Sequence, residues 1–332
     1  MKKHEQILAG ILIVQIILTV VVFWPKSSAT VASEPIFPDL ESGDIVWFTI
    51  VDADGNNVTL QKVTGEWVLP DADDYPVTED KVTSLAEKLA TLSTGRLVTR
   101  TDASHKQLQV APDTFVRRIE FETTDGAKHI LYLGSSPNYG AIHFRLEGEN
   151  ETYLTNDIST VDANATAASW IETTYVNVPQ NDIVKLTLKN GNGTFVFVRE
   201  AVPGQGAEGE EVGQWTMEGL AADETLSETR VTATVRQAAW LNMIRPLGKE
   251  NKPAYGMDKP SAVATVETAD RSVTLRIGAQ DPEDNSYAAI SSESPYYVRV
   301  AEFSVQNLVE NTREDFLELP STPTPEGEGD TS

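Results

Sequence analysis

The sequence repeats itself, and this internal repeat is the feature that most limits the folds open to the chain. Asp44-Ile45-Val46 recurs as Asp182-Ile183-Val184, and each triplet opens a segment in which apolar and polar residues alternate. A turn rich in Gly and Asn follows in both copies, at residues 54–57 and 190–193, and a second alternating segment comes after it. Such turns tolerate positive φ angles and join antiparallel strands. Each copy is therefore predicted to begin with a β-hairpin.

An amphipathic helix is predicted after each hairpin, beyond an equivalent tryptophan, Trp67 or Trp215. In the first copy Thr78 is suited to the N-cap, and two acidic residues follow it in the first turn. The apolar positions then have the three- and four-residue spacing of one helical face. They are Val82, Leu85, Leu89 and Leu92 in the first copy, and Val231, Val235, Ala238, Leu241 and Ile244 in the second.

The second half of each copy also matches. Two alternating segments around a charged turn, in residues 118–134 and 262–278, predict a further pair of strands. Tyr139-Gly140-Ala141-Ile142 is then matched with Tyr287-Ala288-Ala289-Ile290, and each copy closes on a short helical stretch that holds one aromatic residue.

Runs of strands with one helix favour the α+β class and a mostly antiparallel sheet packed on that helix. We therefore expect two tandem, duplicated sheet-plus-helix units, the first over residues 34–178 and the second over residues 179–319. Residues 1–33 precede them as a cytoplasmic stub, a transmembrane anchor and a linker. The acidic tail, residues 320–332, is rich in Pro and Gly and is predicted to be disordered.

The anchor is predicted from the apolar run Ile7–Trp24, which carries no charged residue. As a helix its eighteen residues would be about 27 Å long, close to the hydrocarbon thickness of a bilayer. Basic residues precede the run, so the positive-inside rule places the N-terminus in the cytoplasm and the rest of the chain across the membrane. The expected localisation is a single-pass cell-membrane protein, with residues 7–24 in contact with lipid. A cleaved signal peptide is the alternative, since small residues follow at 27–32.

Composition excludes several function classes. The chain has 50 acidic and 26 basic residues, a net charge of −24, and such a surface repels phosphate backbones. Nucleic acid is therefore not expected as a partner. The chain has no cysteine, which excludes disulfides, thiol nucleophiles and cysteine-based zinc sites.

No catalytic, cofactor-binding or metal-binding residue is predicted, and no cofactor is expected. His105, His129 and His143 lack the two-histidine spacing of a catalytic zinc site. The acidic stretch Asp52–Asn57 fails the spacing of an EF-hand, so a hairpin turn is favoured, and Asp281–Asn285 is interpreted as a solvated turn that could hold a divalent ion weakly.

The serines and aromatic residues are interpreted in the same way. Ser135, Ser136, Ser291 and Ser292 are the candidate nucleophiles, and none lies in a G-x-S-x-G elbow. Trp47, Trp67, Trp215 and Trp240 are predicted to be core residues, with a carbohydrate-stacking platform as the alternative.

Three segments of the second copy carry a family resemblance: "AYGMDKPSAVATV" at 254–266, "SVTLRIG" at 272–278 and "YYVRV" at 296–300. With these segments the chain resembles the bacterial proteins grouped as domain of unknown function 4340. The resemblance implies an extracytoplasmic protein with one N-terminal anchor. It also implies a gene often placed beside an ABC transporter and gliding-motility-type auxiliary components. It brings no catalytic residue with it.

Three functions are therefore weighed. The leading hypothesis is an accessory or interaction protein without catalytic activity, whose partners would be ABC transporter membrane subunits or auxiliary proteins. The second is a module that binds envelope glycan or peptide, which requires exposed aromatic residues on one sheet face. The third is a hydrolase of envelope polymers, which requires a cleft with converging polar residues, for example around His143 or Ser136.

Overall fold

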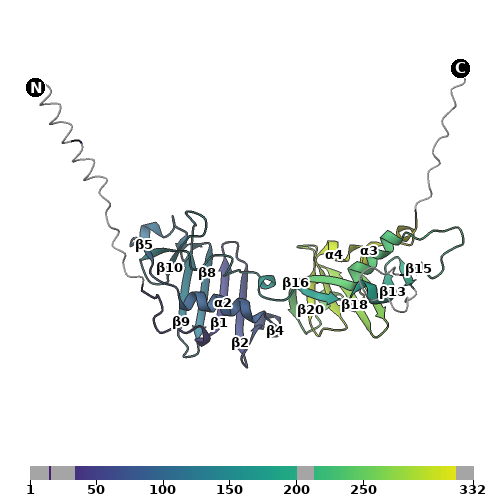
Figure 1. Ribbon diagram of the computed structural model, residues 1–332, viewed down its shortest axis with the longest axis horizontal. Helices are drawn as coiled ribbons and strands as arrows, with labels where there is room; N and C mark the ends of the chain where they lie inside the picture. The colour runs from purple at the N-terminus through teal and green to yellow at the C-terminus, as the bar shows by residue number, and fades with distance from the viewer. Residues whose placement is uncertain (1–14, 16–33, 200–212, 319–332) are drawn as a thin grey trace, which may run out of the picture.

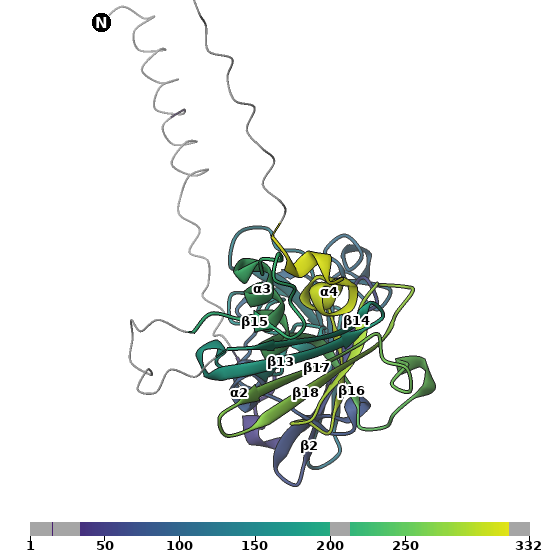
Figure 2. The same cartoon turned by 90° about the vertical axis from the view of Figure 1, so that its right-hand side faces the viewer.

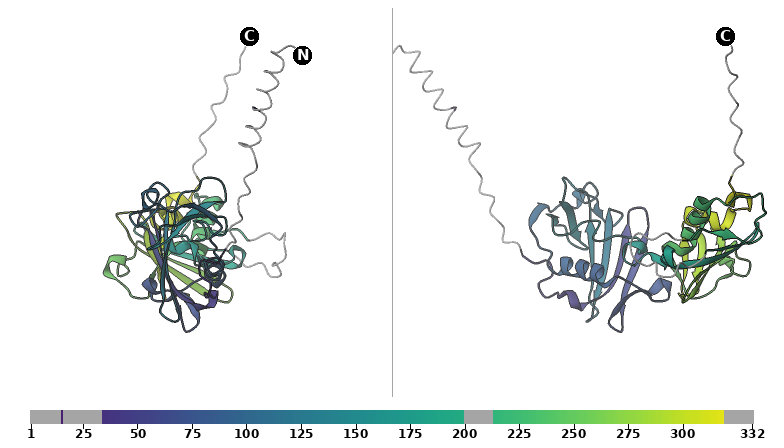
Figure 3. Two further views of the ribbon diagram at one scale, coloured as in Figure 1. Left: turned by 90° about the vertical axis from the view of Figure 1, so that its left-hand side faces the viewer. Right: turned by 45° about the vertical axis from the view of Figure 1, so that its right-hand side comes forward.

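The computed structural model describes residue 15 and residues 34–199 and 213–318, and this part of the chain forms two units that lie end to end (Figures 1 and 3). Each unit is built on a nine-stranded antiparallel sheet. We call residues 34–173 the first unit and residues 174–318 the second unit, according to the sheet that each segment joins.

The first sheet has the strand order β4-β3-β2-β1-β8-β9-β10-β11-β5, and helix α2 (Glu79–Ala90) packs on one face. Its strands are β1 (Ile45–Asp52), β2 (Asn57–Val63), β3 (Glu66–Leu69), β4 (Tyr75–Pro76), β5 (Arg96–Thr99), β8 (Arg117–Thr123), β9 (Lys128–Leu133), β10 (Ile142–Leu146) and β11 (Thr152–Thr155). A separate short pair, β6 (Val110–Ala111) and β7 (Thr114–Phe115), lies in the loop before β8.

The second sheet has the order β12-β16-β20-β19-β18-β17-β13-β14-β15, and α3 (Glu228–Ala239) and α4 (Glu302–Glu310) cover one face (Figure 2). Its strands are β12 (Thr174–Asn177), β13 (Ile183–Asn190), β14 (Gly193–Val198), β15 (Thr216–Met217), β16 (Trp240–Gly248), β17 (Ala262–Thr268), β18 (Ser272–Gln280), β19 (Tyr287–Ser291) and β20 (Tyr297–Val300). Strand β12 precedes the expected boundary after residue 178 but pairs with β16 of the second sheet.

The two units share one topology. From β3 to β5, the first sheet runs β3-β2-β1-β8-β9-β10-β11-β5, and the second runs β15-β14-β13-β17-β18-β19-β20-β16. The irregularity at the start of the first strand is repeated as well, between Ile45 and Trp47 and between Ile183 and Lys185. The repeat in the sequence therefore corresponds to a repeat in space.

Alternation along the strands places one set of side chains in the core beneath the helices. In β1, for example, Ile45, Phe48 and Ile50 are buried, and in β13 so are Ile183, Leu186 and Leu188. The helix predicted in the first copy is confirmed as α2, which begins after Thr78, but Leu92, assigned to its apolar face, lies beyond the end of the helix at Ala90 and is buried there. The buried residues of α2 are Val82, Leu85, Ala86 and Leu89.

The helix predicted in the second copy is wrong at its C-terminal end. Helix α3 ends at Ala239, and the residues assigned to its last turns, Leu241 and Ile244, belong to β16. The residues from Trp240 to Ile244 alternate between exposed and buried, which is the period of a strand. Pairing with β12 and β20 fixes this conformation and overrides the helical spacing.

The expected fold class also needs correction at its N-terminal end. The fold consists of mostly antiparallel sheets with helices of 12, 12 and 9 residues in α2, α3 and α4. Among the residues that the structure describes, no helix is long and apolar enough to cross a membrane. Apart from Gln15, the run Ile7–Trp24 lies outside those residues, and so does the tail 320–332. Localisation and lipid contact stay predictions.

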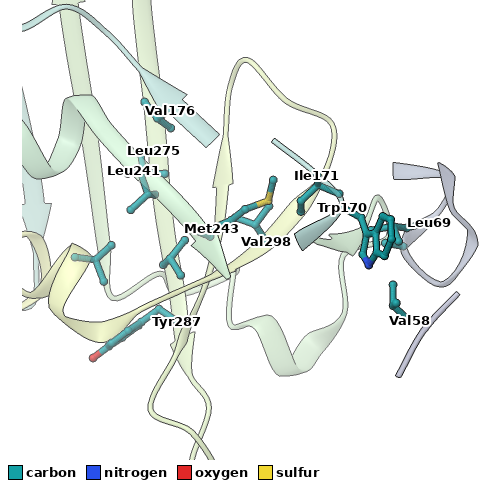
Figure 4. Packing of buried hydrophobic residues seen from close by; sticks show 14 of the residues in the cluster. Val58, Leu69, Trp170, Ile171, Val176, Leu241, Met243, Leu275, Tyr287 and Val298 are labelled. Carbon is teal, nitrogen blue, oxygen red and sulfur yellow. The ribbon is translucent and has the colours of Figure 1, made fainter. Parts of the chain in front are cut away.

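Residues 170–173, which lead from the first unit into the second, are hydrogen-bonded to both of them. The backbone N–H of Thr78 donates to the carbonyl of Trp170 at 2.7 Å, and that of Met243 donates to the carbonyl of Thr173 at 2.9 Å. Figure 4 shows Ile171 between buried side chains of the first unit and those of the second. Because the buried apolar residues form one continuous cluster across this point, the units share a core.

A second contact between the units is centred on Tyr296. Its hydroxyl donates to the carbonyl of Asp74 at 3.0 Å, its ring meets that of Tyr75 edge to face, and the Lys249 ammonium lies 4.7 Å from its ring centroid. The backbone N–H of Lys249 donates to the carboxylate of Asp73 at 2.6 Å. Burial, followed by neighbouring tyrosines, raises the pKa of Tyr75 to about 12.

One loop packs against the outer face of each sheet, opposite the helices. It is the loop before β8 in the first unit and the loop before β17 in the second, and each lies beside a glycine. A Cβ atom on Gly134 would clash with the carbonyl oxygen of Leu108, and one on Gly278 would clash with that of Tyr255. We therefore predict that Gly134→Ala and Gly278→Ala each destabilise the protein by about 1–3 kcal/mol, because overpacking against backbone is not relieved by rotamer changes.

Matched controls exist in both units. A Cβ at Gly43 or Gly191 meets nothing within 4 Å, so Gly43→Ala and Gly191→Ala should leave the free energy of unfolding nearly unchanged. Urea denaturation of the four variants measures the difference. Equal midpoints for the test and control variants would show that the loops do not depend on these glycines.

Candidate functional site

The histidines named from the sequence have structural surroundings. His105 is buried, and its Nε2 lies 3.0 Å from the carbonyl oxygen of Asn150. His129 packs against two phenylalanines, with ring centroids 5.0 Å from Phe37 and 4.9 Å from Phe121. Within residues 34–199 and 213–318, no three His, Asp or Glu side chains are grouped so that they could hold a metal ion.

Ser135 and His143 are the one serine–histidine pair named from the sequence that the structure brings together. The Ser135 hydroxyl lies 3.1 Å from Nδ1 of His143, but the carbonyl oxygen of Ser135 lies closer to the same nitrogen, at 2.7 Å. A nitrogen at that distance from a carbonyl carries the hydrogen and donates it. Nδ1 is then no base for the hydroxyl, which itself donates to the carbonyl of Leu108 at 3.2 Å.

The first acidic turn is a hairpin turn closed by Asp52. The Asp52 carboxylate accepts hydrogen bonds from the backbone N–H groups of Asp54 and Asn56 and from the Asn56 side chain, at 2.9–3.0 Å. Burial alone would raise the pKa of the Asp52 carboxyl, but these bonds and the nearby Arg117 bring the pKa below its ordinary value. The carboxylate is thus committed to the turn.

The second acidic turn holds a buried arginine. Nη2 of Arg299 donates to Asp281 Oδ2 at 2.7 Å, and Nη1 contacts the carbonyl of Ser286. The Asp284 carboxylate accepts a hydrogen bond from the backbone N–H of Ser286 at 2.9 Å. Hydrogen bonding to Ser286 is the main reason why the pKa of the Asp284 carboxyl is below its ordinary value. A cation at this turn would compete with the arginine.

The tryptophans divide into two groups. Trp67 and Trp215 are buried at equivalent positions, as predicted for core residues. Trp240 and Trp47, which were also predicted to lie in the core, are not buried: Trp240 is 49% exposed at the start of β16, and Trp47 is half-buried in β1. Tyr139, at the predicted turn of the first unit, is fully exposed.

A pocket of about 310 Å³ lies on the outer face of the second sheet, on the side away from α3 and α4. The sheet contributes residues of β18, β19 and β20 to it: Thr274, Arg276, Ile290, Ser291 and Tyr297. The loops contribute Asn251, Met257, Asp258 and Ser292. This volume is at the lower end of the range of small-molecule sites.

The loop that forms one wall of the pocket is held on the sheet by local geometry. The 3₁₀ turn Pro253–Tyr255 ends at Gly256, whose φ of 66° is in the left-handed region that glycine favours. Tyr255 and Met257, on either side of Gly256, pack on Ala288 in a small apolar cluster separate from the main core. Nη2 of Arg276 then donates to the carbonyl of Met257 at 2.7 Å.

The equivalent position in the first unit is filled. Gln109, with a φ of 57°, is the counterpart of Gly256, and Val110 is the counterpart of Met257. There the carbonyl of Val110 accepts a hydrogen bond from Nε of Arg145 at 2.7 Å. Arg145 is buried and lies over the ring of Tyr132, 4.9 Å from its centroid.

The strand register shows which residues replace this pair in the second unit. Leu133 pairs with Phe144 in the first sheet, and Ile277 pairs with Ala289 in the second. The next pair in each sheet is Tyr132 with Arg145 and Arg276 with Ile290. Arg276 is therefore the counterpart of Tyr132, and Ile290 is the counterpart of Arg145. The sequence match of Tyr139 with Tyr287 is therefore wrong by three residues, since the same register makes Ile142 the counterpart of Tyr287.

The chemistry of the pocket is mixed. It offers one guanidinium, one carboxylate, an amide and several hydroxyls beside the apolar surfaces of Met257, Ile290 and the Tyr297 ring. Such a site can hold and orient a small polar molecule. Of the pocket residues, sequence reasoning named only Ser291 and Ser292, as candidate nucleophiles, although most of the others lie in or beside the segments that carry the family resemblance.

The first unit supplies a test of this comparison. Arg145 donates to three carbonyl groups, those of Val110, Leu146 and Glu149, at 2.7–2.9 Å. We predict that Arg145→Met destabilises the protein by about 2–4 kcal/mol, because the buried carbonyl of Val110 and two partly buried carbonyls lose their donor. Arg276→Met, at an exposed position, should cost less than about 1 kcal/mol. Thermal and urea unfolding measure both, and equal losses would contradict the assignment of Arg145 as the filled counterpart.

Comparison with known proteins identifies the family. The family model described as domain of unknown function (DUF4340) matches residues 67–260, which is 194 of the 332 residues. The match runs from β3 of the first unit to the pocket loop of the second. No curated protein and no solved structure matches the chain. With more than half of its length inside the match, the chain belongs to the DUF4340 family, as its resemblance indicated.

Proposed function

We propose that this protein is a non-catalytic accessory protein that binds a small polar ligand in its second unit. One observation carries the proposal: the two units share one topology but differ at an equivalent place on the outer faces of their sheets. The first unit fills it with the buried Arg145 over Tyr132, and the second has Ile290 and Arg276 there beside an open pocket. Protein interiors and loops normally pack closely, and the first unit shows that this place can be filled. The opening in the second unit therefore supports a ligand-binding role.

A hydrolytic function is less well supported. The Ser135–His143 pair has its Nδ1 hydrogen directed at a carbonyl, and neither residue lines the pocket. The pocket itself contains a single carboxylate, Asp258, whereas glycoside hydrolysis commonly uses two. Binding is the simpler use of this set of side chains.

The test replaces Arg276 and Ile290 of the pocket by the residues found at the equivalent positions of the first unit. In the double variant Arg276→Tyr/Ile290→Arg, the second unit receives the pair that fills the first. We predict that small polar compounds detected by ligand-observed NMR with the wild-type protein are no longer bound by this variant. Tyr139→Ala, at a fully exposed position of the first unit, is the control and should keep all ligands.

A second variant distinguishes the loss of the pocket from the loss of the fold. If the variant unfolds, which circular dichroism would reveal, the single change Ser292→Trp blocks the same pocket from a loop. A compound library in which no ligand distinguishes the wild type from the filled or blocked variant would refute the proposed binding function.

A second function, contact with protein partners, is favoured by exposed apolar side chains in the second unit. Trp240 is 49% exposed, Ile244 42% and Phe303 76%, and large exposed side chains of this kind are enriched at protein interfaces. The family resemblance implies ABC transporter membrane subunits or auxiliary proteins as partners. We therefore propose that these side chains contact such a complex.

This proposal predicts a loss of partners on substitution. Trp240→Ser/Phe303→Ser should reduce the recovery of transporter subunits at least tenfold when the full-length protein is isolated from its native cells and analysed by mass spectrometry. Val161→Ser, which removes a side chain 80% exposed in the first unit, should not. Equal recovery with both variants, or no transporter subunit with the wild type, would reject the proposed contact between these side chains and a transporter complex.

A further inference from the structure

We infer that the pocket of the second unit takes a neutral saccharide, one or two sugar rings in size. This inference rests on the proposed binding function and adds the chemical class of the ligand. Three properties of the pocket point to that class: its charge balance, its hydrogen-bonding groups and its apolar wall.

The charges of the pocket cancel. Arg276 and Asp258 are the charged residues among those that line it, and both are exposed at its rim. One guanidinium nitrogen already donates to the carbonyl of Met257. An anionic ligand would also have to approach a chain of net charge −24, which repels it. A cationic ligand would meet Arg276. The pocket therefore favours a ligand without net charge.

The hydrogen-bonding groups act as both donors and acceptors. The backbone N–H of Thr274 donates to Oγ of Ser292 at 3.0 Å, so the hydroxyl hydrogen of Ser292 remains for another acceptor. The amide of Asn251 offers both functions, and the planar guanidinium and carboxylate at the rim can each engage two neighbouring hydroxyls. Sugar hydroxyls donate and accept at once, so they match such a set.

The apolar wall suits the C–H face of a sugar ring. It consists of Ile290, Met257 and the ring of Tyr297, which packs on Tyr255 with centroids 5.5 Å apart and is thereby held in place. Aromatic rings held in this way offer a flat surface to a ligand that is apolar on one side and polar at its edge.

The position of the pocket disfavours an extended peptide. Strands β18 and β19 lie inside the sheet, with hydrogen-bonded neighbours on both sides. They have no free edge to which a peptide backbone could add as a further strand. A volume of about 310 Å³ likewise fits a small ligand rather than a chain that crosses the surface.

The experiment titrates the full-length protein with two neutral saccharides, maltose and di-N-acetylchitobiose, and with two charged probes, glutamate and lysine. Binding is followed by calorimetry and saturation-transfer NMR. We expect at least one saccharide to bind. Tyr297→Ala should weaken that binding tenfold or more, and Arg276→Tyr/Ile290→Arg should abolish it. Tyr139→Ala, the exposed tyrosine of the first unit, should leave it unchanged.

Each alternative result is informative. Saccharide binding that survives both pocket variants would place the site elsewhere and overturn the inference. If glutamate or lysine binds in a manner that the filled variant abolishes, while no saccharide binds, the saccharide class is wrong but the proposed binding function stands. If no compound of the wider library binds at the pocket either, the proposed function itself fails.

Discussion

The close approach of a loop to a glycine on the outer face of each sheet is the contact on which that face, and with it the pocket, depends. A nine-stranded sheet has two faces, and the helices cover only one of them. On the other face, the loops before β8 and β17 reach the sheet because Gly134 and Gly278 have no side chain. The same loop that closes the outer face also forms a wall of the pocket in the second unit.

Duplication explains how the pocket could arise without loss of the fold. In both units a carbonyl of this loop receives a hydrogen bond from an arginine, but the arginine comes from β10 in the first unit and from β18 in the second. Exchanging the strand that supplies Arg145 or Arg276 keeps the loop in place. It also leaves Ile290 where the first unit has a buried guanidinium, and space opens beside it.

The junction between the units connects this pocket to the rest of the molecule. The hydroxyl of Tyr175 donates to the carbonyl of Tyr296 at 2.6 Å and accepts from the backbone N–H of Ser291, a residue of the pocket, at 2.9 Å. Tyr296 in turn contacts Asp74 and Tyr75 of the first unit. Strand β12, which carries Tyr175, therefore belongs to the second sheet and also serves as the link between the units.

The sequence by itself determined the repeat, the hairpins, α2 and the mostly antiparallel character of both sheets, because alternation, turn composition and helical spacing are local properties. It also led to the family, through segments of the second copy. Tertiary structure alone decided that Leu241 and Ile244 are in a strand, since pairing with β12 and β20 outweighs their helical spacing. It likewise decided the pocket, because Asn251, Arg276 and Tyr297 meet only when loop and strands pack, and no local pattern marks residues so far apart in the chain.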